Sequence, residues 1–190
     1  TSQVIARSGY SKQGGFEIYL DDSTLGHDLW DTIWAAGQSF NISPGCPNLI
    51  ERIEGGLFSY GNEMTRQNNP LECGMNDYVV LDGSIDFIGL NALQKIKADG
   101  ITKQIRAILF DGSPCPTCSK PWPVMAGDNK DIKIGEVTSG IYSPRLEKNI
   151  GLSMIDRDYW SSGQKVTVQC ADGLVREGVV STLPLVESLI

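Results

Sequence analysis

The hydrophobic pattern near the start of the chain predicts a strand with two distinct faces. A glycine-rich turn leads into residues 16–20, which combine the aromatic and branched side chains that strands favour. Alternation puts three apolar side chains on one face, namely Phe16, Ile18 and Leu20. The other face carries Glu17 beside Tyr19. That pair is either an ordinary solvent-facing pair or a carboxylate that accepts N–H bonds from a flat, nitrogen-rich ligand.

Apolar side chains spaced four residues apart predict a helix after this strand. Its repeats are Leu29 with Ile33 and Trp30 with Trp34, and Gly37 supplies the stop. We expect the two tryptophans to belong to a core rather than to form a platform for a ligand.

A second helix is predicted where Pro47 suits a first helical turn and a glycine pair ends the segment. Leu49 and Ile53 mark its buried side. Arg52 borders that side, so it could pair with a neighbouring glutamate or bind an anionic ligand in bidentate fashion. Further along, residues 78–81 predict a strand, and residues 90–96 predict a last short helix closed by a glycine.

From about residue 101 the chain consists of short strand-like runs separated by turn residues, including the hairpin signal Asp172-Gly173. The runs are residues 104–110, 133–139, 149–155, 165–170 and 174–180. We therefore predict an α+β protein in which a mixed α/β part, residues 1–99, precedes a small antiparallel β-barrel or sandwich, residues 100–190.

Charge and hydropathy exclude several classes of partner. The net charge of −7 and the pI near 4.7 argue against a nucleic-acid partner, which requires clustered Lys and Arg. No apolar run approaches the roughly 18 residues that a membrane span requires. The chain enters a strand-like pattern almost at its first residue, and we expect it to be cut from a longer protein.

The cysteines are five in number and scattered, which favours reduced thiols in a cytoplasmic protein. Cys115 and Cys118 form a single C-x-x-C in a proline-rich loop, without a second pair or nearby histidines. This falls short of a structural zinc site. We expect no metal site and no bridged cysteine.

Three motifs resemble those of the glycine-cleavage T-protein (aminomethyltransferase) superfamily. The first is Gly-Tyr-Ser at residues 9–11 followed by Gly-Phe-Glu-Ile at residues 15–18. The second comprises residues 52–54 and 57–63, and the third comprises residues 135–144 and 150–152. The resemblance implies a folate-binding domain followed by a C-terminal β-barrel.

Other residues depart from the glycine-cleavage enzymes and are similar to dimethylsulfoniopropionate demethylases. Those are Ser-Lys-Gln-Gly-Gly at residues 11–15 and the stretch from Pro44 to Glu54. Such enzymes transfer a methyl group from a sulfonium to tetrahydrofolate. The resemblance implies that an N-terminal half, with most of the sulfonium pocket and the catalytic residues, is missing from this chain.

By this resemblance, Glu17 holds the pteridine, Tyr19 and Tyr10 border it, and Arg52 contacts a polar or anionic part of the folate. An aminomethyltransferase of the glycine-cleavage or dimethylglycine type and a non-catalytic folate-binding module remain alternatives. Because uncovered apolar surface tends to find a partner, we also expect the chain alone to self-associate.

Overall fold

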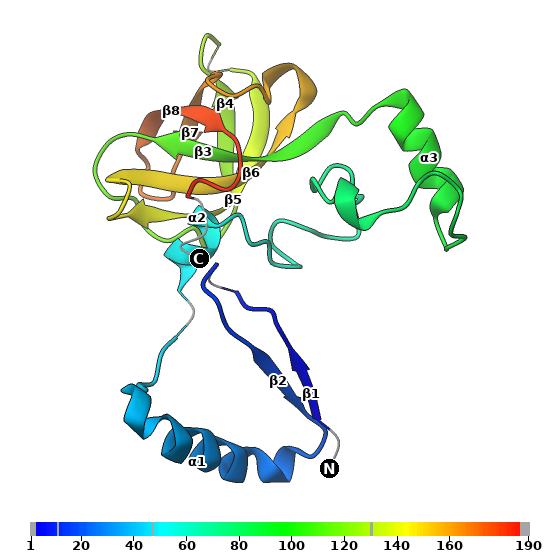
Figure 1. Cartoon of the computed structure of the whole chain (residues 1–190). Coiled ribbons are helices and arrows are strands. Elements are labelled where there is room, and N and C mark those ends of the chain that lie inside the picture. Colours follow the sequence, from blue (N-terminus) through cyan, green and yellow to red (C-terminus); the bar gives the residue numbers. More distant parts are fainter. Residues whose placement is uncertain (1–2, 11, 47, 130, 187–190) are drawn as a thin grey trace.

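A computed structural model of the chain describes residues 3–10, 12–46, 48–129 and 131–186. The barrel occupies one end of the molecule, and residues 3–10 and 12–40 extend away from it (Figure 1). This arrangement confirms the predicted α+β class with a small antiparallel barrel.

The second part of the chain forms a closed antiparallel barrel with the strand order β3-β6-β5-β4-β7-β8. Its strands are β3 (Lys103–Phe110), β4 (Trp122–Ala126), β5 (Lys133–Ser143), β6 (Lys148–Asp156), β7 (Lys165–Gln169) and β8 (Val175–Ser181). The 3-10 helix η4 (Arg157–Tyr159) follows β6. Asp172-Gly173 makes the predicted turn between β7 and β8, where Gly173 has a φ of 80° that favours glycine.

The barrel has its own hydrophobic core, built from alternate residues of its strands. Ile108, Phe110, Trp122, Val124 and Ile155 are among the side chains that meet there. Close strand pairing requires a small residue at one position of β5: a Cβ on Gly135 would lie 2.3 Å from the carbonyl oxygen of Met154. Burial of this core makes the barrel a rigid base for the rest of the chain.

Strand β4 is the barrel strand that the sequence pattern missed. Pro121 precedes it and Pro123 lies within it, and proline cannot donate a ladder hydrogen bond. The strand pairs with β5 and β7, with a register shift between Val124 and Met125. Proline is tolerated here next to an irregularity in the ladder.

Two strands and a helix make up the part that extends from the barrel. Strand β1 (Gln3–Ala6) pairs antiparallel with β2 (Glu17–Leu20), and the turn between them points toward the barrel (Figure 1). The 3-10 helix η1 (Ser23–Leu25), helix α1 (Gly26–Gly37) and the 3-10 helix η2 (Gln38–Phe40) follow. The predicted helix that ends at Gly37 is thus confirmed.

The prediction that the tryptophans of α1 belong to a core is wrong for this chain. Trp30 is 57% exposed and stacks on Trp34, with the ring centroids 6.2 Å apart. Neither face of the β1–β2 hairpin is covered either, since Ile18 on one face is 37% exposed and Tyr19 on the other is 54% exposed. The periodic pattern is real, but the segment from Ile42 to Gly45, which lines a groove with Trp30 and Trp34, leaves both rings partly exposed.

Helix α2 (Leu49–Glu54) lies beneath the barrel and buries Ile53 completely, as the pattern predicted (Figure 1). The side chain of Asn48 caps it by accepting from the N–H of Glu51. Pro47, predicted in the first turn, lies outside the described residues.

The predicted strand at residues 78–81 is wrong. Tyr78 ends the 3-10 helix η3 (Asn76–Tyr78) and is exposed, and residues 79–81 pair with no strand among the described residues. Local hydrogen bonds replace sheet pairing there, such as the one from the Val79 N–H to the Asn76 carbonyl. Helix α3 (Leu90–Asp99) confirms the last predicted helix, and Gly100 follows it with a φ of 79°.

Candidate functional site

Glu17 is the first residue of β2 and lies where the hairpin turn re-enters the sheet. Its partner across the ladder is Ala6. Ser8, in the turn, donates its hydroxyl to Oε2 of the Glu17 carboxylate. The carboxylate is otherwise exposed. It is held at one oxygen and can accept further N–H bonds from a ligand.

Two tyrosines accompany this carboxylate on the same hairpin. Tyr19 follows Glu17 by two residues, so strand alternation places both side chains on one face. Tyr19 is 54% exposed, and Tyr10 lies in the turn with part of its ring exposed. Three of the four predicted folate contacts therefore belong to one accessible element.

Arg52, the fourth predicted contact, is buried in α2 and has protein partners. Its Nη1 donates to the Leu57 carbonyl at 3.2 Å and to Oε2 of Glu63 at 3.1 Å, and its Nη2 donates to the hydroxyl of Ser139. Only 6% of Arg52 is exposed. The spacing had suggested that Arg52 could pair with Glu51 or Glu54 of its own helix. The guanidinium pairs with neither of them. Contact with folate stays a prediction.

The partner of Arg52, Glu63, is fully satisfied as well. Oε1 of Glu63 accepts the hydroxyl proton of Ser139, and Oε2 also accepts the backbone N–H of Ser59 at 2.7 Å. One serine of the barrel thus accepts from a buried arginine and donates to a buried glutamate. The Arg52 guanidinium, the Glu63 carboxylate and the Ser139 hydroxyl each have hydrogen-bond partners. A buried ion pair requires such partners.

A second buried carboxylate, that of Glu54 in α2, binds the same barrel strand. Oε1 of Glu54 accepts from the hydroxyl of Ser143 at 2.6 Å, and Oε2 lies 3.6 Å from Nη1 of Arg145. Ser139 and Ser143 are four residues apart on β5, a spacing that places both side chains on one face of the strand. That spacing is the sequence signal that could have revealed these residues as a polar contact surface.

The hairpin turn contacts α2. Nε2 of Gln13 donates to Oε1 of Glu51 at 3.1 Å. The side chain of Lys12 lies over Gly55, where an added Cβ would come within 2.3 Å of the Lys12 Cγ. The hairpin that carries Glu17 is therefore joined to the helix that the barrel binds.

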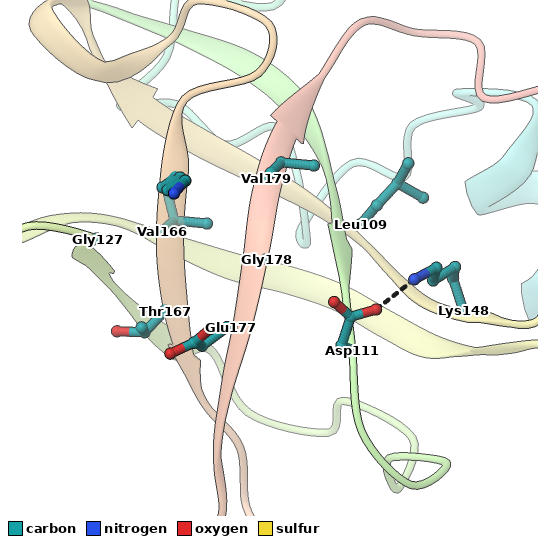
Figure 2. A pocket seen from close by; sticks show the side chains of 10 residues that line it. Leu109, Asp111, Gly127, Lys148, Val166, Thr167, Glu177, Gly178 and Val179 are labelled. Atoms are coloured by element: carbon teal, nitrogen blue, oxygen red, sulfur yellow. Dashed lines mark hydrogen bonds and ion pairs between the residues drawn. The ribbon is translucent and has the colours of Figure 1, made fainter.

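A groove with a volume of about 470 Å³ lies on the barrel, away from the predicted ligands (Figure 2). Its charged groups include the Asp111–Lys148 ion pair and the side chains of Lys165 and Glu177. The Asp111 and Lys148 side chains are about half exposed, so they remain hydrated and the pairing contributes little. None of the sequence-predicted site residues lines this groove.

Cys115 and Cys118 lie beside the barrel core, and burial makes them poor nucleophiles. Loss of hydration raises the pKa of Cys115 to about 12 and that of Cys118 to about 11. None of the five cysteines, all of which are among the described residues, forms a disulfide in the structure. Among the described residues, no group of three or more His, Cys, Asp or Glu side chains could hold a metal ion.

We expect alkylation by iodoacetamide to distinguish these thiols from accessible ones. At pH 8 the thiolate fraction is roughly 1 in 10,000 for Cys115 and roughly 1 in 1,000 for Cys118, because a raised pKa keeps the thiol protonated below it. Peptide mass spectrometry should show slow native labelling of both residues and faster labelling of the exposed Cys46. Labelling of Cys115 as fast in the native protein as in denaturant would contradict this.

Comparison with known families explains this arrangement. The GCVT N-terminal domain model matches residues 1–83, and the glycine cleavage T-protein C-terminal barrel domain model matches residues 103–187. The chain belongs to the glycine-cleavage T-protein family.

None of the helices in the described part of the chain has the length and apolar character that crossing a membrane requires.

Individual relatives include both enzyme types that the sequence suggested. The chain is 45% identical to the dimethylsulfoniopropionate demethylase DmdA of Ruegeria pomeroyi over 92% of its own length and 48% of the relative's. It is 37% identical to an aminomethyltransferase of Caldanaerobacter subterraneus, over 87% of its own length and 43% of the relative's. The chain thus spans about half the length of these relatives.

A solved structure shows the same fold. The glycine cleavage system aminomethyltransferase T from Bartonella henselae matches with a TM-score of 0.82 and 22% sequence identity. The match covers 98% of this chain and 50% of that one. At this identity the match establishes the fold alone.

Proposed function

We propose that this chain is the folate-contacting part of a tetrahydrofolate-dependent methyltransferase that demethylates dimethylsulfoniopropionate to methylmercaptopropionate, forming 5-methyltetrahydrofolate. The observation that carries the proposal is the accessible Glu17 carboxylate, with Tyr19 and Tyr10 exposed on the same hairpin. The glycine-cleavage T-protein family is in general tetrahydrofolate-dependent, and the demethylase relative supports the choice of substrate.

The donor and acceptor chemistry of the hairpin suits a pteridine. A carboxylate can accept two N–H bonds from an aminopyrimidine edge, and Ser8 holds this one in place through Oε2. The rings of Tyr19 and Tyr10 can border a flat heterocycle. When bound, tetrahydrofolate supplies the nitrogen that accepts the transferred carbon.

The proposed methyl transfer mainly requires the protein to align the sulfonium with the folate nitrogen. A methyl sulfonium is an activated electrophile, so the residues need to orient it and exclude water rather than provide a covalent nucleophile. In this proposal the sulfonium pocket and the catalytic residues belong to the half of the relatives that this chain does not span. The uncovered apolar side chains of β2 and α1, such as Phe16 and Trp30, fit a surface that this other half covers.

An aminomethyltransferase is the second candidate, because several relatives at 34–37% identity carry that name. A folate-binding module without catalytic activity is the third. The hairpin chemistry is the same in all three, so the donor molecule distinguishes them.

The test is an assay of the full-length protein that carries this chain. Incubation with dimethylsulfoniopropionate and tetrahydrofolate should give methylmercaptopropionate and 5-methyltetrahydrofolate in equal amounts by mass spectrometry. Turnover of an aminomethyl donor instead would establish the second candidate. Folate binding without turnover of either donor would establish the third.

A further inference from the structure

The barrel holds α2 through a buried polar contact that we call the serine latch. It consists of Ser139 and Ser143 of β5 together with Arg52, Glu54 and Glu63. Glu54 and Glu63 are almost completely buried, at 2% and 3% exposure. Two carboxylates taken out of water are tolerated only with partners in place, so the latch favours one position of α2.

Apolar packing reinforces the same position. Ile53, between Arg52 and Glu54 in sequence, is fully buried against Ile150 and Leu152 of β6. The backbone of Leu185, after the last barrel strand, also donates to the Glu54 carbonyl at 2.8 Å. Helix α2 is thus fixed to the barrel by side chains on both sides of Ile53.

The helix in turn contacts the hairpin at two points. Glu51 accepts from Gln13, and Gly55 lies under Lys12. The turn that holds Lys12 and Gln13 leads within a few residues to Glu17. Contacts therefore run from the barrel to α2 and from α2 to the hairpin turn, and the chain itself leads from that turn to Glu17, the candidate folate ligand.

We propose that the serine latch positions the β1–β2 hairpin, and that Arg52 is a positioning residue that holds the Glu17 carboxylate in place for folate. This rests on the proposed function. An isolated two-stranded hairpin is marginally stable in water, so its orientation depends on what it is attached to. Releasing α2 from β5 lets the hairpin open and move.

The test compares Ser139→Ala/Ser143→Ala with Ser153→Ala in the full-length protein. Ser153 is a matched control because it is also a fully buried barrel serine, but its hydroxyl donates to the Glu136 carbonyl. Hydrogen exchange of residues 3–20 and titration with tetrahydrofolate are measured for each. Losing hydrogen bonds to buried charged groups should speed exchange in the hairpin and weaken tetrahydrofolate binding by about 10-fold or more.

Ser153→Ala should leave both quantities within about 2-fold of wild type, because it disturbs the barrel without touching α2. Equal effects of the two changes, or no effect of the latch variant, would overturn the proposal. If wild type binds no tetrahydrofolate, the proposed function fails, and the exchange comparison alone decides whether the latch orders the hairpin.

A second set of variants leaves the barrel core untouched. Gln13→Glu places a carboxylate against Glu51, and like charges should loosen the hairpin. Adding Glu51→Gln exchanges donor and acceptor and should restore wild-type exchange rates and binding. If Gln13→Glu/Glu51→Gln fails to restore either the hydrogen-exchange rates or tetrahydrofolate binding, the proposed step from α2 to the hairpin is contradicted.

Discussion

Replacing Glu17 with Gln is expected to weaken tetrahydrofolate binding to the full-length protein by roughly 10- to 150-fold. A carboxylate accepts N–H bonds at both oxygens, whereas the amide offers one acceptor and one donor, and that donor would face another donor. Loss of a charge-assisted hydrogen bond in a desolvated pocket costs on the order of 1.5–3 kcal/mol, which corresponds to this range of affinity.

The same change should have little effect on folding, because Glu17 is exposed on a short strand. The free energy of unfolding should fall by less than about 0.5 kcal/mol. Glu177→Gln, on an exposed position of β8, is the matched control and should leave folate binding unchanged. Unchanged binding by Glu17→Gln together with a sharply lowered melting temperature would mean that Glu17 is structural.

Replacing Arg52 with Met is expected to lower the free energy of unfolding by roughly 3–5 kcal/mol, because the change leaves the Glu63 carboxylate buried without its cation. Only 8% of the Arg52 side chain and none of the Glu63 side chain is exposed, so water cannot replace the missing partner. Denaturant titration measures the loss directly.

Two further variants separate this cost from the general effect of losing a cation. Lys133→Met removes an exposed partner of Glu136 and should cost less than about 1 kcal/mol. Arg52→Met/Glu63→Met removes both buried charges and should recover part of the loss seen in the single variant. A loss from Arg52→Met no larger than that from Lys133→Met would contradict the burial argument.

Local patterns in the sequence predicted most of the secondary structure. The spacing in α1 and α3, and the Asp172-Gly173 turn, depend on residues within a few positions of one another. Where a local signal and the tertiary structure disagree, the tertiary structure decides. Pro123 is accepted in β4 beside a register shift, and Tyr78 has a strand-like neighbourhood but pairs with no strand among the described residues.

The same distinction applies to the candidate site: local sequence reveals some of its features, and only the fold reveals the others. Glu17 and Tyr19 share a face because of strand alternation, which the sequence reveals. The partners of Arg52 do not follow from local spacing, because Ser139 is 87 residues away along the chain. Residues next to Arg52 suggested Glu51 or Glu54 as its partner, whereas the fold supplies Glu63.

The exposed tryptophans of α1 show a different limit. The apolar repeat predicted a buried helix face, and the helix formed, but the surface that would bury Trp30 and Trp34 is not among the described residues. Relatives about twice as long fit this observation. We expect the chain alone to self-associate through this face.

A crystal structure of the full-length protein with tetrahydrofolate bound tests the central claim most directly. We predict that the aminopyrimidine edge of the ring donates to the Glu17 carboxylate within about 3.2 Å, with Tyr19 and Tyr10 beside the ring and Arg52 still bound to Glu63 and Ser139. Tetrahydrofolate bound elsewhere, for example in the barrel groove beside Lys148, with Glu17 facing solvent, would contradict it.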